Sequence, residues 1–219
     1  RLGVPDKLVS RLRDCALYDR GLALCTGVTG SGKTTTLCSL VAGLDDYPLK
    51  ILTIEDPVEY ELPNATQSCV NEAQGWTFAT ALRAFLRQDP DVILVGEIRD
   101  RESAEIACRA GLTGHCVLST LHARRPLTAV ERLHAWGIET GVIAESLRLV
   151  VHQRLLRTPS GELSARFEWM SPEPVEIRGF LKGEREDLPL SAQEDCLPSA
   201  SAWARMASSA ALKQWAWVM

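Results

Sequence analysis

The sequence predicts a three-layer α/β fold in which a mostly parallel sheet lies between helices. Short apolar runs typical of strands alternate along the chain with segments of helical periodicity. One run, Val92-Ile93-Leu94-Val95, is wholly apolar, as expected for a central parallel strand covered on both faces. A glycine-rich loop at residues 27–34 joins another strand to a helix. Open α/β sheets bind ligands beyond the carboxyl ends of their strands, so we expect a ligand site at that edge.

Composition excludes several classes of function. The 219 residues suffice for one large domain or for a domain with an appendage. The net charge of −4 argues against a nucleic-acid-binding face, and no apolar run approaches the ~18 residues of a membrane-spanning helix. Residues 1–6 lack the apolar core of a signal peptide. The 7 cysteines include no C-x-x-C pair, so we expect a reducing compartment and no zinc site.

The N-terminal residues 1–20 are expected to form a helix that covers one edge of the core. Their apolar residues recur at helical spacing, namely Leu8, Val9, Leu12, Cys15 and Ala16. Charged residues interrupt this stripe, and nothing in the segment suggests chemistry. A short buried strand is expected next, at residues 22–26.

Residues 27–34 read Gly-Val-Thr-Gly-Ser-Gly-Lys-Thr and match the phosphate-binding pattern G-x-x-x-x-G-K-[ST]. A helix is expected to follow over residues 35–43. Glycines permit positive φ, so that backbone N–H groups approach the phosphates, and the first turn of the helix adds further N–H groups. We expect Lys33 to reach the β- and γ-phosphates and the Thr34 hydroxyl to bind Mg²⁺. The expected nucleotide-binding residues are Gly27, Thr29, Gly30, Ser31, Gly32, Lys33, Thr34 and Thr35.

Acidic residues follow two of the expected strands. The strand at 49–54 delivers Glu55 and Asp56 at its carboxyl end, where an acid can reach a nucleotide or remain a solvated surface residue. The strand at 92–95 is followed by Gly96 and Glu97. A phosphate-loop enzyme needs a carboxylate beside the loop to order Mg²⁺ or water, and Glu97 is the candidate. Its alternative role is to cap the helix expected over residues 101–110.

Further elements are expected on either side of these strands. Thr77 is a plausible N-cap for a helix over residues 77–88. His115 and His122 bracket a strand at 116–121, and their separation of seven residues places them on opposite faces unless the ends curl. A shared metal site is therefore not expected, and each histidine is either structural or functional.

The second half of the chain is expected to be less regular. Helices are predicted at 126–136 and 139–150, followed by a last core strand at 151–156. Beyond residue 157 we expect an appendage, 158–219, appended to a core of residues 1–157. Within the appendage, 165–170 reads as a strand, 182–202 as a linker or disorder, and 201–219 as a short helix rich in Ala and Trp.

Four motifs in this order resemble those of the secretion ATPases of type II secretion and type IV pilus assembly. They are the loop at 27–34, an Asp-box-like stretch at 53–60, a Walker-B-like stretch at 86–100 and a His-box-like stretch at 113–122. The resemblance covers residues 3–157 and implies a RecA-like ATPase core that uses ATP and Mg²⁺. It also implies a homo-hexamer, cytoplasmic and peripheral at the inner membrane, that acts with an inner-membrane platform protein to drive pilin assembly or type II secretion.

The same resemblance implies roles for individual residues. Glu55 would be the base that orients the attacking water, and Glu97 would act on Mg²⁺ or its water shell. His115 and His122 would sense the γ-phosphate. Arg87 and Arg99 would serve charge stabilisation or subunit contacts, and the resemblance does not say which one acts as an arginine finger.

The chain also departs from the family pattern. Val28 replaces the usual proline of the loop, and Ala123-Arg124-Arg125 follows His122 where the family has Thr-Asn and small residues. The four-cysteine zinc module and the family's N-terminal domain have no counterpart in this sequence. An alternative to the motor core is therefore a nucleotide-binding remnant or regulatory subunit that does not hydrolyse ATP. A P-loop kinase is a third reading, but the sequence shows no arginine-rich lid insertion.

Overall fold

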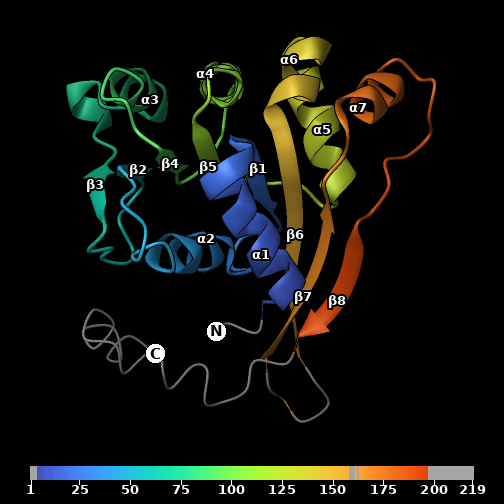
Figure 1. Ribbon diagram of the computed structural model, residues 1–219, viewed down its shortest axis with the longest axis horizontal. Coiled ribbons are helices and arrows are strands. Elements are labelled where there is room, and N and C mark those ends of the chain that lie inside the picture. The colour runs from blue at the N-terminus through green and yellow to red at the C-terminus, as the bar shows by residue number, and fades with distance from the viewer. Residues whose placement is uncertain (1–3, 158–160, 162, 197–219) are drawn as a thin grey trace.

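The structure is a computed structural model that describes residues 4–157, 161 and 163–196. In this part of the chain a single eight-stranded sheet has the order β3-β2-β4-β5-β1-β6-β7-β8. Helices α1 and α2 lie on one face of the sheet, and α3 to α7 lie on the other (Figure 1). The predicted three-layer α/β fold is confirmed.

The strands are β1 (Gly21–Thr26), β2 (Ile51–Glu55), β3 (Ala65–Cys69), β4 (Val92–Val95), β5 (Cys116–Leu121), β6 (Leu147–Arg157), β7 (Leu163–Met170) and β8 (Ala192–Cys196). The helices are α1 (Asp6–Asp14), α2 (Lys33–Ala42), α3 (Phe78–Phe85), α4 (Arg101–Leu112), α5 (Pro126–Ala135), α6 (Thr140–Ser146) and α7 (Pro174–Leu181). A π-helical turn, Cys15–Asp19, continues α1, and a 3₁₀ turn, Glu72–Gln74, precedes α3. The predicted strands at 22–26, 92–95 and 116–121 are confirmed to within one residue.

The first six strands of this order, from β3 through β2, β4, β5 and β1 to β6, run parallel to one another. At the β6 side, β7 pairs antiparallel with β6, and β8 pairs antiparallel with β7. Parallel pairing brings the carboxyl ends of distant segments together. Thr26, the last residue of β1, lies opposite Leu121 of β5 and His152 of β6. The residues that follow β1, β2, β4 and β5 therefore meet at one edge of the sheet, which is where ligands bind in open α/β folds.

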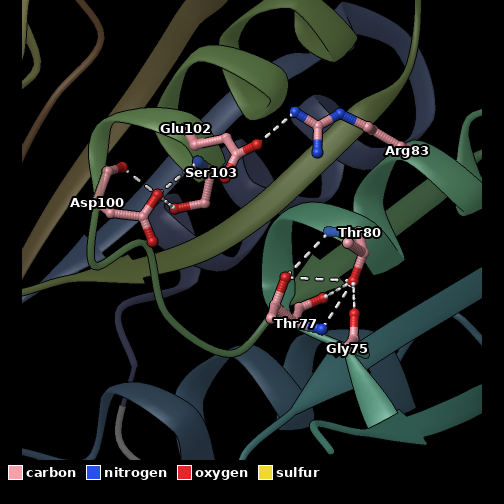
Figure 2. Close-up of polar contacts among 7 residues, drawn as sticks. All are labelled: Gly75, Thr77, Thr80, Arg83, Asp100, Glu102 and Ser103. Atoms are coloured by element: carbon pink, nitrogen blue, oxygen red, sulfur yellow. Dashed lines mark hydrogen bonds and ion pairs between the residues drawn. The ribbon is translucent and has the colours of Figure 1, made fainter. Parts of the chain in front are cut away.

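The helices α3 and α4 begin at side-chain caps, and Figure 2 shows both. Thr77 caps α3 as predicted, accepting from the Thr80 backbone N–H at 3.3 Å. Asp100 caps α4, and its Oδ1 accepts from the Ser103 backbone N–H at 2.8 Å. Because Asp100 fills this role, Glu97 is not the capping acid of α4, and the alternative considered for Glu97 is excluded.

The helix predicted over residues 139–150 is confirmed up to residue 146 and wrong over residues 147–150. Helix α6 ends at Ser146, and strand β6 begins at Leu147. Leu147 and Val150 pack into the core on the α3-to-α7 face, whereas Leu149 and Val151 pack into the core on the α1 and α2 face. An apolar segment buried on both faces of a sheet has no polar side, so its periodicity does not distinguish a strand from a buried helix.

The sheet and both cores continue past the predicted boundary at residue 157. Strand β7 pairs with β6, and Phe167 of β7 lies fully buried beneath the α1 and α2 layer. Within the segment 182–202, predicted as a linker or disorder, Leu188 is buried, and the prediction is wrong for residues 192–196, which form β8 and pair with β7. The helix predicted at 201–219 lies outside the described residues. In the described part of the chain, no helix has the length and apolar character needed to cross a membrane.

Candidate nucleotide-binding site

A cavity of about 420 Å³ lies at the carboxyl edge of the sheet, where the ends of β2, β4 and β5 meet the glycine-rich loop that follows β1. It is lined by Thr29, Gly30, Gly32, Lys33, Thr34, Thr35, Glu55, Asp56, Glu59, Gly96, Glu97, Thr120, His122 and Leu155. All four sequence motifs contribute to this lining, and only Thr35 and Leu155 of the lining residues lie outside them. The cavity size is in the range of small-molecule and cofactor sites.

The loop presents its backbone to this cavity. Gly30 and Gly32 have φ of +76° and +84°, values that side-chain-bearing residues rarely adopt. Helix α2 begins at Lys33, two residues earlier than predicted, directly after Gly32. Gly32 is the N-cap and has no side chain to accept from the first-turn N–H groups, so these donors remain available to an anion. The local geometry suits phosphate binding.

Lys33 is the cation of the loop. Its side chain is largely buried, and its Nζ donates to the Val28 carbonyl oxygen at 3.0 Å. Burial lowers the pKa of the Lys33 ammonium from its usual value, while the charge of Glu97 acts in the opposite direction. A bound phosphate would favour the charged form of Lys33, because opposite charges at close range stabilise each other.

Glu55 ends strand β2 with its carboxylate at the cavity, 2% exposed. Its Oε1 accepts from Thr53 Oγ1 at 2.7 Å and from Gln67 Nε2 at 2.9 Å. Its Oε2 is buried and has no hydrogen-bond partner among the described residues. A buried polar atom without a partner is unfavourable by ~1–3 kcal/mol, so Oε2 is placed to accept from a ligand or a water in the cavity.

Glu97 connects three of the motifs. Its Oε1 lies 2.9 Å from His122 Nε2, and its Oε2 accepts from Arg99 Nε at 2.7 Å. Arg99 also donates through Nη1 to Asp56 Oδ2 at 3.1 Å. The residues that follow β2, β4 and β5 are thus joined by one chain of polar contacts, and three of its members, Asp56, Glu97 and His122, line the cavity. The predicted catalytic residue Arg99 does not line the cavity itself, but it contacts Asp56 and Glu97, which do.

Among the predicted catalytic residues, His115 and Arg87 lie away from the cavity. His115 precedes β5, at the opposite edge of the sheet, and its Nδ1 lies 3.1 Å from Thr113 Oγ1. Seven residue steps of about 3.3 Å along β5 separate His115 from His122 by roughly 23 Å. Arg87 is exposed and follows α3, next to the start of β4 at that same far edge. The structure does not bring His115 or Arg87 to the cavity of this chain.

Gly27 and Ser31 belong to the loop, but both are buried and neither lines the cavity. Ser31 Oγ is buried without a partner among the described residues. A Cβ atom on Gly27 would lie 2.5 Å from Ser31 Oγ, so this position requires glycine for space as well as for its φ of +148°. Both residues act on the shape of the loop, and neither has direct access to a ligand in this geometry.

Two residues that support the site were not identified from the sequence. Gln67 of β3 holds Glu55, and it also donates to the Tyr60 carbonyl oxygen at 2.8 Å. Arg132 of α5 donates to the His122 carbonyl oxygen at 2.6 Å and stacks on Trp136 at 4.8 Å from the ring centroid. Neither lies in a motif, and only the neighbouring positions of β2 and β3, and of α5 and the end of β5, make them relevant.

The residues present fit a nucleotide with Mg²⁺. No group of three His, Cys, Asp or Glu residues that could hold a metal occurs among the described residues. Mg²⁺ in nucleotide sites relies on one or two protein oxygens together with phosphate oxygens and water, so such a group is not required. The Thr34 hydroxyl and the Glu97 carboxylate line the same cavity and are two oxygen donors that would hold the ion there.

Comparison with known proteins gives matches across most of the chain. The family model described as "Type II/IV secretion system protein" matches residues 1–182. The type II secretion system protein HxcR of Pseudomonas aeruginosa is 51% identical over 156 residues, which are 71% of this chain and 33% of that protein. The type IV pilus assembly ATPase PilB of Thermus thermophilus is 43% identical over 185 residues, 84% of this chain and 20% of that protein. The chain thus spans about a third or less of these curated relatives.

Solved structures give similar matches. The pilus retraction motor PilT with bound ADP superimposes with a TM-score of 0.71 at 34% identity, covering 84% of this chain and 55% of that chain. The ATPase DotB of Legionella pneumophila superimposes with a TM-score of 0.70 at 29% identity, covering 83% of this chain and 55% of that chain.

Proposed function

The chain belongs to the type II/IV secretion system protein family, and from this we propose that it is the ATP-hydrolysing core of a motor for pilus assembly or type II protein secretion. One observation carries the proposal. Glu55, whose buried carboxylate has one oxygen without a hydrogen-bond partner among the described residues, lines a cavity whose other wall is the phosphate loop with Lys33. This arrangement suits the positioning of a water molecule against a bound phosphate.

Each residue of the cavity has a task in this proposal. The N–H groups of residues 29–34 and the Lys33 ammonium bind the phosphates, and Thr34 with Glu97 would hold Mg²⁺. The metal, when bound, neutralises charge on the β- and γ-phosphates. Glu55 accepts a hydrogen bond from water through Oε2, while Thr53 and Gln67 keep its other oxygen fixed. His122 and Arg99 hold the Glu97 carboxylate.

We infer that these residues work within an assembly. Asp56 and Glu59 line the cavity yet stay exposed, so a nucleotide bound there would need a second surface to cover it. A homo-hexamer supplies such a surface from the neighbouring subunit, and a membrane platform protein on the cytoplasmic side of the inner membrane is the expected partner. The far-edge position of Arg87 favours a subunit contact over a role in its own site. All lining residues precede residue 157, so we assign the ATPase function to residues 1–157.

The test is Mg²⁺-dependent ATP hydrolysis over a series of protein concentrations, with Lys33→Ala and Glu97→Gln beside the unmodified chain. We expect specific activity that rises with concentration, because the sites are completed by association, and that vanishes in both variants. Binding of ATP without turnover at every concentration would favour the alternative, a nucleotide-binding subunit that depends on other chains. No binding of ATP by the unmodified chain would overturn the assignment of the site.

A further inference from the structure

Strand β6 passes directly beneath the phosphate loop. Its residues on the α1 and α2 face change in character along the strand, from Val151 in the core to Gln153 under the loop and Leu155 at the cavity. Because Thr26 of β1 lies opposite His152, the next residue of β6, Gln153, comes beside the first residue of the loop. Gln153 is only 4% exposed, and a buried polar side chain is unfavourable unless it makes hydrogen bonds. The partners of Gln153 lie around the phosphate loop.

The Gln153 side chain is anchored from one end. Its Oε1 accepts from Thr36 Oγ1, in the first turn of α2, at 2.8 Å. The same oxygen lies 3.9 Å from Cys25 Sγ of β1. The amide is therefore held between the strand that enters the loop and the helix that leaves it, and its Nε2 end is directed at the loop.

Gln153 also lies close to two of the loop glycines, Gly27 and Gly32. A Cβ atom on Gly32 would lie 2.8 Å from Gln153 Nε2, and one on Gly27 would lie 2.4 Å from the Gln153 carbonyl oxygen. Gly30, in contrast, would meet nothing within 4 Å. The first and third glycines of the loop are thus packed against one residue of β6, whereas Gly30 faces open space.

We propose that Gln153 is a positioning residue of the nucleotide site and that its side chain sets the position and orientation of the phosphate loop through Gly32 and Thr36. The proposal rests on the function proposed above for that site. A loop of glycines with positive φ loses much conformational freedom on ordering, so contacts that order it before the ligand arrives strengthen binding. Gln153 supplies such contacts without touching the ligand.

The experiment measures the Kd of Mg-ADP by calorimetry, and the melting temperature without nucleotide, for two substitutions. Gln153→Met keeps the length of the side chain but removes the acceptor for Thr36. Gln153→Glu keeps that acceptor and places a negative charge beneath the loop. We expect Gln153→Met to weaken binding about tenfold, the equivalent of one hydrogen bond, and Gln153→Glu to weaken it further. Gln74→Glu, an exposed site with the same change in charge, should leave the Kd unchanged.

A second variant approaches the contact from the helix. Thr36→Val removes the hydroxyl that donates to Gln153 and preserves the shape of the side chain. Thr36→Val and Gln153→Met together should weaken Mg-ADP binding less than the product of the single effects, because both remove one contact. This pair keeps the proposal testable if one variant folds poorly.

The outcomes separate the two proposals. Variants at Gln153 that melt earlier but bind Mg-ADP with an unchanged Kd would overturn the positioning role and leave the proposed function intact. An unmodified chain that does not bind Mg-ADP would overturn the proposed function, and the positioning role with it. Weaker binding in both Gln153 variants, with an unchanged Kd in Gln74→Glu, would support the role.

Discussion

Gln67 Nε2 donates a hydrogen bond of 2.9 Å to Oε1 of Glu55, although Gln67 lies on the edge strand β3 and does not line the cavity. Thr53 donates to the same oxygen from β2, so that oxygen is held from two sides. The other oxygen, Oε2, is left for a ligand or water. An edge strand thereby sets the orientation of the residue proposed to activate water.

The first prediction concerns Glu55 itself. Glu55→Gln keeps the shape of the side chain but removes its ability to take a proton, so ATP hydrolysis should fall by ~10²–10⁴-fold. Binding of Mg-ADP should be unchanged, because the proposed role of Glu55 is toward water and not toward the phosphates. Steady-state hydrolysis and calorimetry check both halves. Hydrolysis that persists in this variant would contradict the proposed role.

The second prediction concerns the support of Glu55. Gln67→Met removes the donor to Oε1 and lets the carboxylate turn, so the turnover number should fall about tenfold with little change in the Michaelis constant. Thr66→Ala is the matched control, because Thr66 is exposed on the same strand. Equal activity in the two variants would show that the contact from β3 has no effect on the site.

The third prediction concerns pH. His152 is buried, its Nδ1 lies 3.0 Å from Thr26 Oγ1, and its Nε2 accepts from Arg154 Nε at 3.0 Å. Burial first, and then the charge of Arg154, lower the pKa of His152 from its usual 6.5. Below that usual value the unfolded state binds more protons than the folded state, so acidification lowers the free energy of unfolding.

The measurement is urea unfolding from about pH 7 to about pH 5, the range in which an ordinary histidine titrates. His152→Gln should show a smaller loss of unfolding free energy over this range than the unmodified chain. His134→Gln, at an exposed position, should follow the unmodified chain. Parallel curves for all three proteins would contradict the prediction.

The fourth prediction tests whether the segment after α7 is part of the core. Leu188 is 3% exposed and belongs to the same buried cluster as Met170 of β7 and Ile177 of α7, so Leu188→Ala should lower the free energy of unfolding by ~2–5 kcal/mol. Leu190 is 48% exposed, so Leu190→Ala should change it by less than ~0.5 kcal/mol. Urea unfolding measures both changes. A small effect of Leu188→Ala would contradict the prediction and show that the segment after α7 is a linker.

Local patterns were sufficient for much of the site. The loop at 27–34 and the acids Glu55 and Glu97 were predictable because each follows an apolar strand, and parallel strands share their carboxyl edge. Strand β6 was harder to predict, because a segment buried on both faces lacks the alternation that reveals a strand. The distance of His115 from the cavity was not predictable for a different reason, since the resemblance identifies a motif but not the end of the strand at which each of its residues lies.

The fold class, the phosphate loop and the acids at the strand ends could be predicted from the sequence, because these features depend on local backbone preference and on burial periodicity. Three features are seen only in the tertiary structure. Gln67 holds Glu55, Gln153 lies beneath Gly27 and Gly32, and the core extends to Leu188. These contacts depend on which strands become neighbours and in which register. Periodicity records whether a residue is buried but not what it is buried against.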